Sequence, residues 1–351
     1  MLNVRRNQRF LEELADFLET QTEETVTISK PKDQIYVPKD AVSALIRKGA
    51  GPVEQLVNLI AYGEEGPLVT EKSFVNTYRG SYRNPWTVIQ NYREAQNRLE
   101  TVESPDELSA SQIARELKQP PQRVYHWLKQ GSKPYALNGL IKVNQMGWVG
   151  FDLDSDIMTQ LNKLVAWILS GGNITRTNMH PKFVLRGDPH QTLLDSIFDD
   201  LGVSFKEETS TVPFNQIEEE QHPHAHPGNK GALLGRVLSV LGAPVGSPLK
   251  GLVSFPPYLY VASKELKESF ARILILNLAS NSTSTSDSQI EIVSPNYSRG
   301  LTKSLYQFFQ NLDGESVDVS AEGVVLDRSF VESLSQNGPE MEANALSSFL
   351  H

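Results

Sequence analysis

The expected fold follows from two apolar stretches: Leu161–Thr175, LNKLVAWILSGGNIT, and Ser269–Ser282, SFARILILNLASNS. Each is long enough to form a helix, and each ends in small or polar residues. A helix at a protein surface shows a polar face with a period of 3.6 residues. These two stretches have almost no polar face. We therefore expect two helices that are buried on most of their circumference and that pack against each other.

The residues that follow the two stretches repeat one order of elements. In both cases strand-like residues come first, then a helical stretch, then a further strand. The first copy comprises Ile174–Thr177, Phe183–Leu185, Gln191–Leu201 and Gly202–Phe205, and the second comprises Gln289–Val293, Leu301–Leu312 and Ser316–Ser320. Repeats at this scale indicate duplicated supersecondary units that share one core. The sequence thus predicts an α+β domain with internal pseudo-symmetry.

This order resembles a single-chain LAGLIDADG homing endonuclease domain over about residues 150–335, roughly half of the chain. Leu164–Gly172 (LVAWILSGG) stands where the family has its first motif helix, and Phe270–Ser280 (FARILILNLAS) where it has its second. Leu233–Pro257 is similar to the segment that ends the first repeat, with a helix, a G-x-P-x-G-like turn and a proline before the next helix. The resemblance implies a pseudo-twofold αββαββα fold whose saddle-shaped sheet surface faces DNA.

The family's catalytic acids are missing from the two motif helices. Active members end each helix with an acidic residue before the final glycine, and the two acids hold divalent metal ions. This chain has Gly171 and Leu278 at the matching positions. Neither side chain offers the oxygen ligands that Mg²⁺ requires, and a two-metal clamp needs carboxylates. We therefore expect a domain that retains a DNA-binding scaffold but has no catalytic site; the acids nearby, Asp195, Asp199 and Asp200, belong to another expected helix.

Composition describes an ordinary soluble chain of 351 residues, with 39% hydrophobic and 21% charged residues and no cysteine. Disulfides and cysteine-based zinc sites are therefore excluded. The first residues lack the apolar core of a signal peptide, and no apolar run is long enough to span a bilayer, so we expect a cytoplasmic protein. The net charge of −9 is unfavourable for binding DNA, since contacts to phosphate need cations.

Positive charge is nevertheless concentrated in Ser109–Val143. This segment has one acidic residue, Glu116, and six basic ones: Arg115, Lys118, Arg123, Lys129, Lys133 and Lys142. Such a local excess in an acidic chain is the electrostatic footprint of a nucleic-acid-binding segment. The acidic remainder would suppress loose binding or suit a salty cytoplasm, and composition does not choose between the two.

Within this segment, Ser109–Gly131 (SASQIARELKQPPQRVYHWLKQG) resembles a helix-turn-helix. Ser109 and Gln112 form a capping-box pattern at the start of the first helix. Ile113, Ala114 and Leu117 would bury that helix, and Val124, Trp127 and Leu128 the second, which begins near Pro121. One departure is Lys118, which stands at the turn position where many members carry glycine for a positive φ.

The outer face of the second helix supplies the expected DNA contacts. Gln and Arg side chains make bidentate contacts with adenine and guanine edges, and Lys suits phosphates. The expected DNA-binding residues are Gln122, Arg123, Tyr125, His126 and Lys129 on this helix, together with Lys118 and Arg115. The alternative is a structural three-helix unit whose outer face is merely solvated. In the endonuclease-like domain, further contacts would come from outward residues of the sheet such as Arg176, Lys182 and Arg186.

Other regions carry weaker signals. We expect a helical region over residues 1–104, with helices at Asn3–Thr20, Pro38–Lys48, Gly51–Tyr62 and Trp86–Leu99 and one or two strands in Thr25–Tyr36. We then expect the helix-turn-helix at 105–135, the LAGLIDADG-like domain at 136–335, opened by a β segment at Gly139–Asp152, and a disordered tail at 336–351.

One cluster of histidines has the spacing of a metal site: His222, His224 and His226 occupy every second position. A polar loop in which histidine alternates with residues such as Pro223 and Pro227 has the same pattern. We expect no metal and no cofactor.

Together these features predict a sequence-specific DNA-binding transcriptional regulator, not an enzyme, with double-stranded DNA as its partner and a homodimer as one possible state. The combination is similar to bacterial sporulation regulators that join a catalytically dead homing-endonuclease domain to a helix-turn-helix, although their helix-turn-helix follows that domain. Two alternatives stay open: an active endonuclease that uses displaced acids, and a scaffold that binds protein. An intein is not expected, because no splice block is present.

Overall fold

The computed structural model describes residues 2–3, 27–29, 34–36, 67–78, 84–103, 108–210, 222–246, 255–280, 288–293, 299–313, 317–320 and 323–350. Contacts divide the chain into two compact units. Unit 2 is Val69–Gly150, and unit 1 combines Met1–Leu68 with Phe151–His351. Within unit 2 the two ends are paired, since the Gly150 amide donates to the Val69 carbonyl at 2.8 Å. The expected boundaries at 104/105 and 135/136 are therefore wrong, because contacts join these segments in one unit.

The regular elements in the described residues of unit 2 are helices. They are α4 (Glu71–Asn76), α5 (Pro85–Glu100), α6 (Ala110–Glu116), α7 (Pro121–Lys129) and α8 (Tyr135–Gln145). The helix expected at Trp86–Leu99 is confirmed as α5, with Asn84 as its N-cap and Pro85 in its first turn. The β segment expected at Gly139–Asp152 is wrong: Leu137, Leu140 and Val143 are buried at helical spacing on α8.

Unit 1 begins with three short strands, β1 (Leu2–Asn3), β2 (Thr27–Ser29) and β3 (Gln34–Tyr36), in the order β1-β3-β2. The strands expected in Thr25–Tyr36 are thus confirmed as β2 and β3. The helices expected at Asn3–Thr20, Pro38–Lys48 and Gly51–Tyr62 lie outside the described residues, apart from Asn3.

The rest of unit 1 contains one order of elements twice. The first copy is α9 (Asp156–Gly171), β4 (Gly172–Ile174), β5 (Pro181–Val184), α10 (Asp188–Asp200), β6 (Phe205–Ser210), β7 (His222–Pro227) and α11 (Gly231–Val240). After the 3₁₀ helix η5 (Pro257–Tyr260), the second copy is α12 (Lys264–Leu278), β8 (Ala279–Ser280), β9 (Gln289–Val293), α13 (Arg299–Asp313), β10 (Val317–Val319), β11 (Gly323–Asp327) and α14 (Arg328–Gln336). A final helix, α15, spans Glu340–Leu350.

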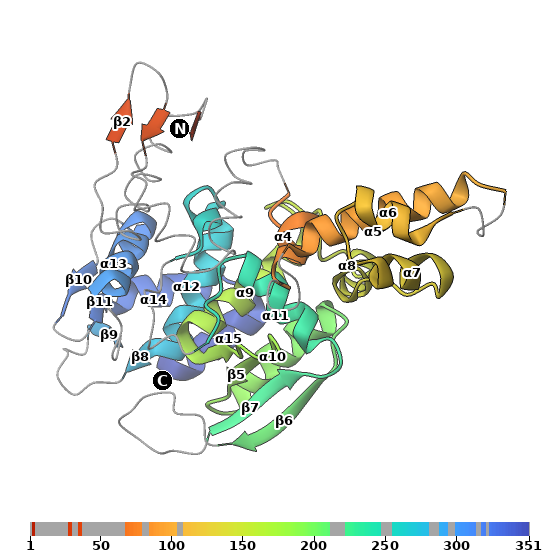
Figure 1. Cartoon of the computed structure of the whole chain (residues 1–351). Coiled ribbons are helices and arrows are strands. Elements are labelled where there is room, and N and C mark those ends of the chain that lie inside the picture. Colours follow the sequence, from red (N-terminus) through yellow and green to blue (C-terminus); the bar gives the residue numbers. More distant parts are fainter. Residues whose placement is uncertain are drawn as a thin grey trace. The chain divides into compact units, whose positions relative to one another are not determined.

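Each copy forms a four-stranded antiparallel sheet with the same strand order. The orders are β4-β5-β7-β6 and β8-β9-β11-β10, so in both sheets the fourth strand of the copy inserts between the second and the third. Helix α9 contacts β4 and β5, and α12 contacts β8 and β9 (Figure 1). The predicted repeat of elements is therefore confirmed in an α+β unit, and the two sheets also share one strand order.

Helices α9 and α12 form the centre of unit 1 and are almost wholly buried, as predicted. Near their N-terminal ends, Asn162 Nδ2 donates to the Leu266 carbonyl at 2.9 Å. Near their C-terminal ends, Asn277 Nδ2 donates to Ser170 Oγ at 3.1 Å. Since like ends are paired, the two helices run in the same direction. Their contact is close, because a Cβ added to Gly171 would lie 3.0 Å from Asn277 Oδ1.

Helix α15 is held by a buried charge network, so the disordered tail expected at 336–351 is wrong. Glu342 lies on α15 with 1% of its side chain exposed. It pairs with Lys163 Nζ of α9 at 2.8 Å and with Arg272 Nη1 of α12 at 3.0 Å. Arg272 Nε also donates to the Leu334 carbonyl of α14 at 2.7 Å. One carboxylate thus connects α15 to both central helices.

Candidate functional site

Helices α6 and α7 and the turn between them contain the residues expected to contact DNA. Ser109 caps α6, because its Oγ accepts a hydrogen bond from the Gln112 amide at 3.3 Å. The expected capping box is only half formed, since Gln112 Nε2 donates to Glu116 Oε1 at 3.2 Å. Ile113 and Ala114 are buried, as predicted.

The turn between the two helices has a left-handed residue. Lys118 has φ = +52°, the conformation predicted for this position. The Gln119 amide donates to the Ala114 carbonyl at 2.9 Å, and the Lys118 amide donates to the Arg115 carbonyl at 3.3 Å. These two bonds form a Schellman motif, which satisfies carbonyls at the end of α6 and fixes the backbone of the turn.

Helix α7 has one buried and one outer face. Val124, Trp127 and Leu128 are buried. The remaining side chains lie outside: Gln122, Tyr125 and Lys129 are exposed, and Arg123 and His126 are half-buried. The spacing of apolar residues therefore predicted correctly which side of α7 faces outward.

Helix α5 supports α6 and α7 from behind. The rings of Tyr92 and Trp127 meet edge to face, with their centroids 5.6 Å apart. Asn91 Nδ2 donates to the Leu117 carbonyl at 3.0 Å, and Gln96 Nε2 donates to the Trp127 carbonyl at 3.2 Å. Carbonyls in the last turn of a helix have no partner within the helix. Side chains of α5 supply partners at the ends of both α6 and α7, and this fixes the position of the outer face.

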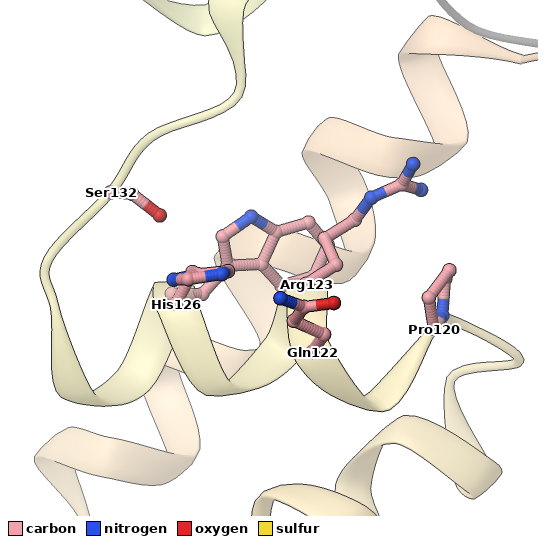
Figure 2. A pocket seen from close by; sticks show the side chains of 6 residues that line it. Pro120, Gln122, Arg123, His126 and Ser132 are labelled. Carbon is pink, nitrogen blue, oxygen red and sulfur yellow. The ribbon is translucent and has the colours of Figure 1, made fainter.

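An open hollow lies on the outer face of α7. Its lining residues are Pro120, Gln122, Arg123, His126, Trp127 and Ser132. Gln122, Arg123 and His126 project from α7 itself, while Ser132 belongs to the loop that follows it (Figure 2). Two glutamines adjoin this hollow through side-chain contacts: Gln119 Oε1 accepts from Arg123 Nη1 at 2.8 Å, and Gln130 bonds the His126 ring.

Three acidic residues of unit 2 form ion pairs with arginines of α5. Glu116 of α6 accepts from Arg98 of α5, which also pairs with Glu94 at 2.8 Å. Hydrogen bonds from Arg98 and then Gln112 lower the pKa of Glu116, so this residue is a carboxylate at neutral pH. Glu71 pairs with Arg93 at 3.0 Å. These three carboxylates therefore do not pair with the cations of α7.

Unit 2 is basic within an acidic chain. Val69–Gly150 contains eleven Lys and Arg against seven Asp and Glu, whereas the whole chain contains 33 against 42. Positive charge concentrated on one compact unit raises the local concentration of a polyanion.

The structure brings five of the predicted site residues together on one helix face: Gln122, Arg123, Tyr125, His126 and Lys129. Lys118 is exposed in the turn that precedes them. Arg115 is exposed on α6, where its Nε donates to the Ser111 carbonyl at 3.4 Å. Sequence reasoning missed Gln119 and Ser132. The spacing of four residues between Gln119 and Arg123 was the available signal.

The C-terminal ends of the two central helices in unit 1 carry no carboxylate. Gly171 is the last residue of α9 and Leu278 the last of α12, and Asn277 contacts Gly171 and Ser170 there. Asp195, Asp199 and Asp200 lie on α10, as expected. Among the described residues no group of three or more His, Asp or Glu could hold a metal ion. His222, His224 and His226 lie on strand β7.

Comparison with known proteins gives no match, neither to a family model nor to the sequence of a curated protein. Within the described part of the chain, no helix is both long enough and apolar enough to cross a membrane.

Proposed function

We propose that the protein is a sequence-specific DNA-binding transcriptional regulator that reads double-stranded DNA with α6, the turn at Lys118 and α7. In this proposal the three form a helix-turn-helix, and α7 enters the major groove. The observation that carries it is the outer face of α7, where amide, guanidinium, imidazole, phenol and ammonium groups lie over a buried Trp127. An α-helix fits the major groove, and these side chains suit base edges and phosphates.

The packing around α7 supports this assignment over a merely solvated surface. Helix α5 fixes both helices, so the outer face is held on a rigid support, as a recognition surface requires. The carboxylate of Glu116 forms an ion pair with Arg98, so its negative charge does not offset the positive charge of α7. The charge of unit 2 has the sign that attracts phosphate, although the whole chain is acidic.

We further propose that the repeated part of unit 1 is a LAGLIDADG-like domain. Three observations support this: the αββαββα order occurs twice, the strand order is the same in both sheets, and α9 and α12 lie side by side in the same direction. In this architecture the sheets would extend the DNA footprint or bind a partner protein. Kinship of fold alone does not assign activity.

Cleavage is not part of the proposal. In a LAGLIDADG-like domain the catalytic acids would end the two central helices, and here those positions are Gly171 and Leu278. Helix α10 carries Asp195, Asp199 and Asp200, and the Asp200 carboxylate accepts from Gln160 at 2.7 Å. No observation favours a displaced metal clamp.

The decisive experiment uses the full-length protein and a pool of randomised duplexes with Mg²⁺, and it scores retained and cleaved molecules separately. Retention of a defined sequence without cleavage is the expected result. Cleavage would contradict the assignment of Gly171 and Leu278 to inactive positions. If nothing is retained, DNA binding is wrong and a protein-binding scaffold becomes the better proposal.

A variant pair then tests the surface. Arg123→Ala with Lys129→Ala should lower affinity for the selected duplex by at least about tenfold, because one base contact and one phosphate contact are lost. The control, Lys72→Ala with Lys264→Ala, removes the same charge from exposed positions on α4 and α12 and should change affinity little. Equal losses would mean that net charge alone governs binding.

If the protein is a dimer, the selected site should be palindromic, with half-sites about one helical turn apart or a multiple of it.

A further inference from the structure

Arg123 is the residue on α7 best suited to recognise one particular base. Its guanidinium can make two parallel hydrogen bonds to O6 and N7 of guanine, the commonest specific contact in the major groove. A flexible arginine must lose its rotamer freedom when it binds, which weakens both affinity and discrimination. The position of Arg123 before binding is therefore important.

Gln119 limits that freedom in the structure. Its Oε1 accepts a hydrogen bond from Arg123 Nη1 at 2.8 Å, and the contact is partly buried. The backbone of Gln119 is itself fixed, because its amide donates to the Ala114 carbonyl at 2.9 Å across the left-handed residue Lys118. A chain of fixed contacts thus runs from the end of α6 through the turn to the guanidinium on α7.

The contact with Gln119 is made through one nitrogen of the guanidinium, Nη1. Arginine has five N–H donors in a planar fork, and the bond to Gln119 uses one of them, on Nη1. Gln119 can only accept through Oε1, so it orients the fork without neutralising its charge. The hollow beside Arg123 is open, which leaves space next to the guanidinium for a base edge (Figure 2).

We propose that Gln119 is a positioning residue that orients Arg123 to recognise a guanine in the major groove of the target duplex. This inference rests on the proposed function, because it presupposes that α7 contacts base edges. To that proposal it adds the base that the site recognises, guanine, and the residue that increases the preference for this base, Gln119. Gln119 acts through Arg123 and touches no base itself.

The test measures base preference, not only affinity. After the target has been selected, the affinity of the full-length protein is measured by fluorescence anisotropy at fixed salt for duplexes with each of the four bases at every position. Arg123→Lys keeps the charge but loses the fork, and it should reduce the preference for guanine at one position by about tenfold or more. Gln119→Ala should reduce the preference at that same position by roughly three- to tenfold.

Two further variants separate positioning from a general structural role. Gln119→Glu keeps an acceptor for Arg123 and should retain the guanine preference. Gln112→Ala is the matched control. The Gln112 side chain donates to Glu116 on α6, so this change should leave the preference unchanged. The salt dependence of binding should be the same for wild type and Gln119→Ala, since no phosphate contact is removed.

The outcomes are distinct. If Gln119→Ala retains the full guanine preference, or weakens all positions equally, Gln119 is not a positioning residue. If Gln119→Ala binds more tightly, the contact holds Arg123 away from DNA and the inference is overturned. If Arg123→Lys leaves the preference unchanged, the base assignment is wrong while DNA binding stands. If wild type retains no duplex, the proposed function fails and this inference fails with it.

Discussion

Glu342→Gln should destabilise unit 1 strongly, although the change is isosteric and lies near the C-terminal end of the chain. The carboxylate is the shared partner of Lys163 and Arg272, and the three side chains are 1%, 9% and 4% exposed in the order Glu342, Lys163, Arg272. Removing one member of a buried ion pair costs about 3–5 kcal/mol, because the remaining charge is left buried without compensation. Both buried cations, Lys163 and Arg272, therefore lose the negative charge that compensates them.

The lower end of that range applies here. Arg272 keeps the Leu334 carbonyl at 2.7 Å and Glu268 at 3.5 Å, and the new amide oxygen can still accept one hydrogen bond. Lys163 loses the ion pair it makes with Glu342. We expect unit 1 to lose about 3 kcal/mol, which corresponds to a roughly 100-fold larger population of the open state.

Native-state hydrogen exchange measures this change for each helix. Amides in α9 and α15 should exchange roughly 100-fold faster in Glu342→Gln than in wild type, whereas unit 2 should be unchanged. The control is Glu332→Gln on α14, where the side chain is exposed and the effect should stay within about 0.5 kcal/mol. Adding Lys163→Met to Glu342→Gln should recover part of the loss by removing an unpaired cation. An effect of Glu342→Gln no larger than that of the control would refute the reasoning.

Three further predictions concern other sites. Lys118→Gly should stabilise unit 2 by about 0.5–1 kcal/mol, because glycine adopts φ = +52° more readily than lysine; a lower melting temperature would contradict this. Burial, and to a smaller extent Arg186, lowers the pKa of His190 to about 4 from 6.5, so the neutral ring favours folding. The stability that this pKa shift provides is fully present above pH 6.5. As the pH falls towards 4 it is lost, and the free energy of unfolding decreases by about 3 kcal/mol. In urea denaturation between pH 7 and pH 4, wild type should therefore lose more stability than His190→Gln, and equal losses would refute the assignment. Lys129→Ala should reduce the slope of log K against log salt concentration for duplex DNA by about 1, and an unchanged slope would exclude a phosphate contact.

The central helices and the repeat could be predicted because their signals are local. The apolar residues of α9 and α12 are continuous along the chain, so burial on nearly all sides follows from the sequence itself. The strands β5 and β9 follow each helix at similar places, which revealed the repeat. What could not be predicted was the strand order, because it depends on which strands pair across the sheet.

The errors occurred where the deciding partner is distant in sequence. The segment that forms α15 was expected to be a disordered tail, and the sequence around Glu342 gives no sign of its buried partners. Its partners Arg272 and Lys163 are 70 and 179 residues away, and no local pattern connects them. Part of α8 was expected in a β segment at Gly139–Asp152. Two glycines, Gly139 and Gly147, weaken a helical pattern there, although Gly147 follows the helix, with φ = +69°.

The candidate site combines both situations. Its outer face was predictable, because Val124, Trp127 and Leu128 repeat at helical spacing and the other side chains must then face outward. The arrangement of the charged group on that face was only partly predictable. The four-residue spacing of Gln119 and Arg123 allows their contact, but the contact also depends on the left-handed backbone of the turn. Periodicity therefore identifies which residues can meet a groove, whereas the geometry of the preceding turn determines which of them is held ready for a base. A change of specificity in this protein should thus arise as readily from the turn as from α7 itself.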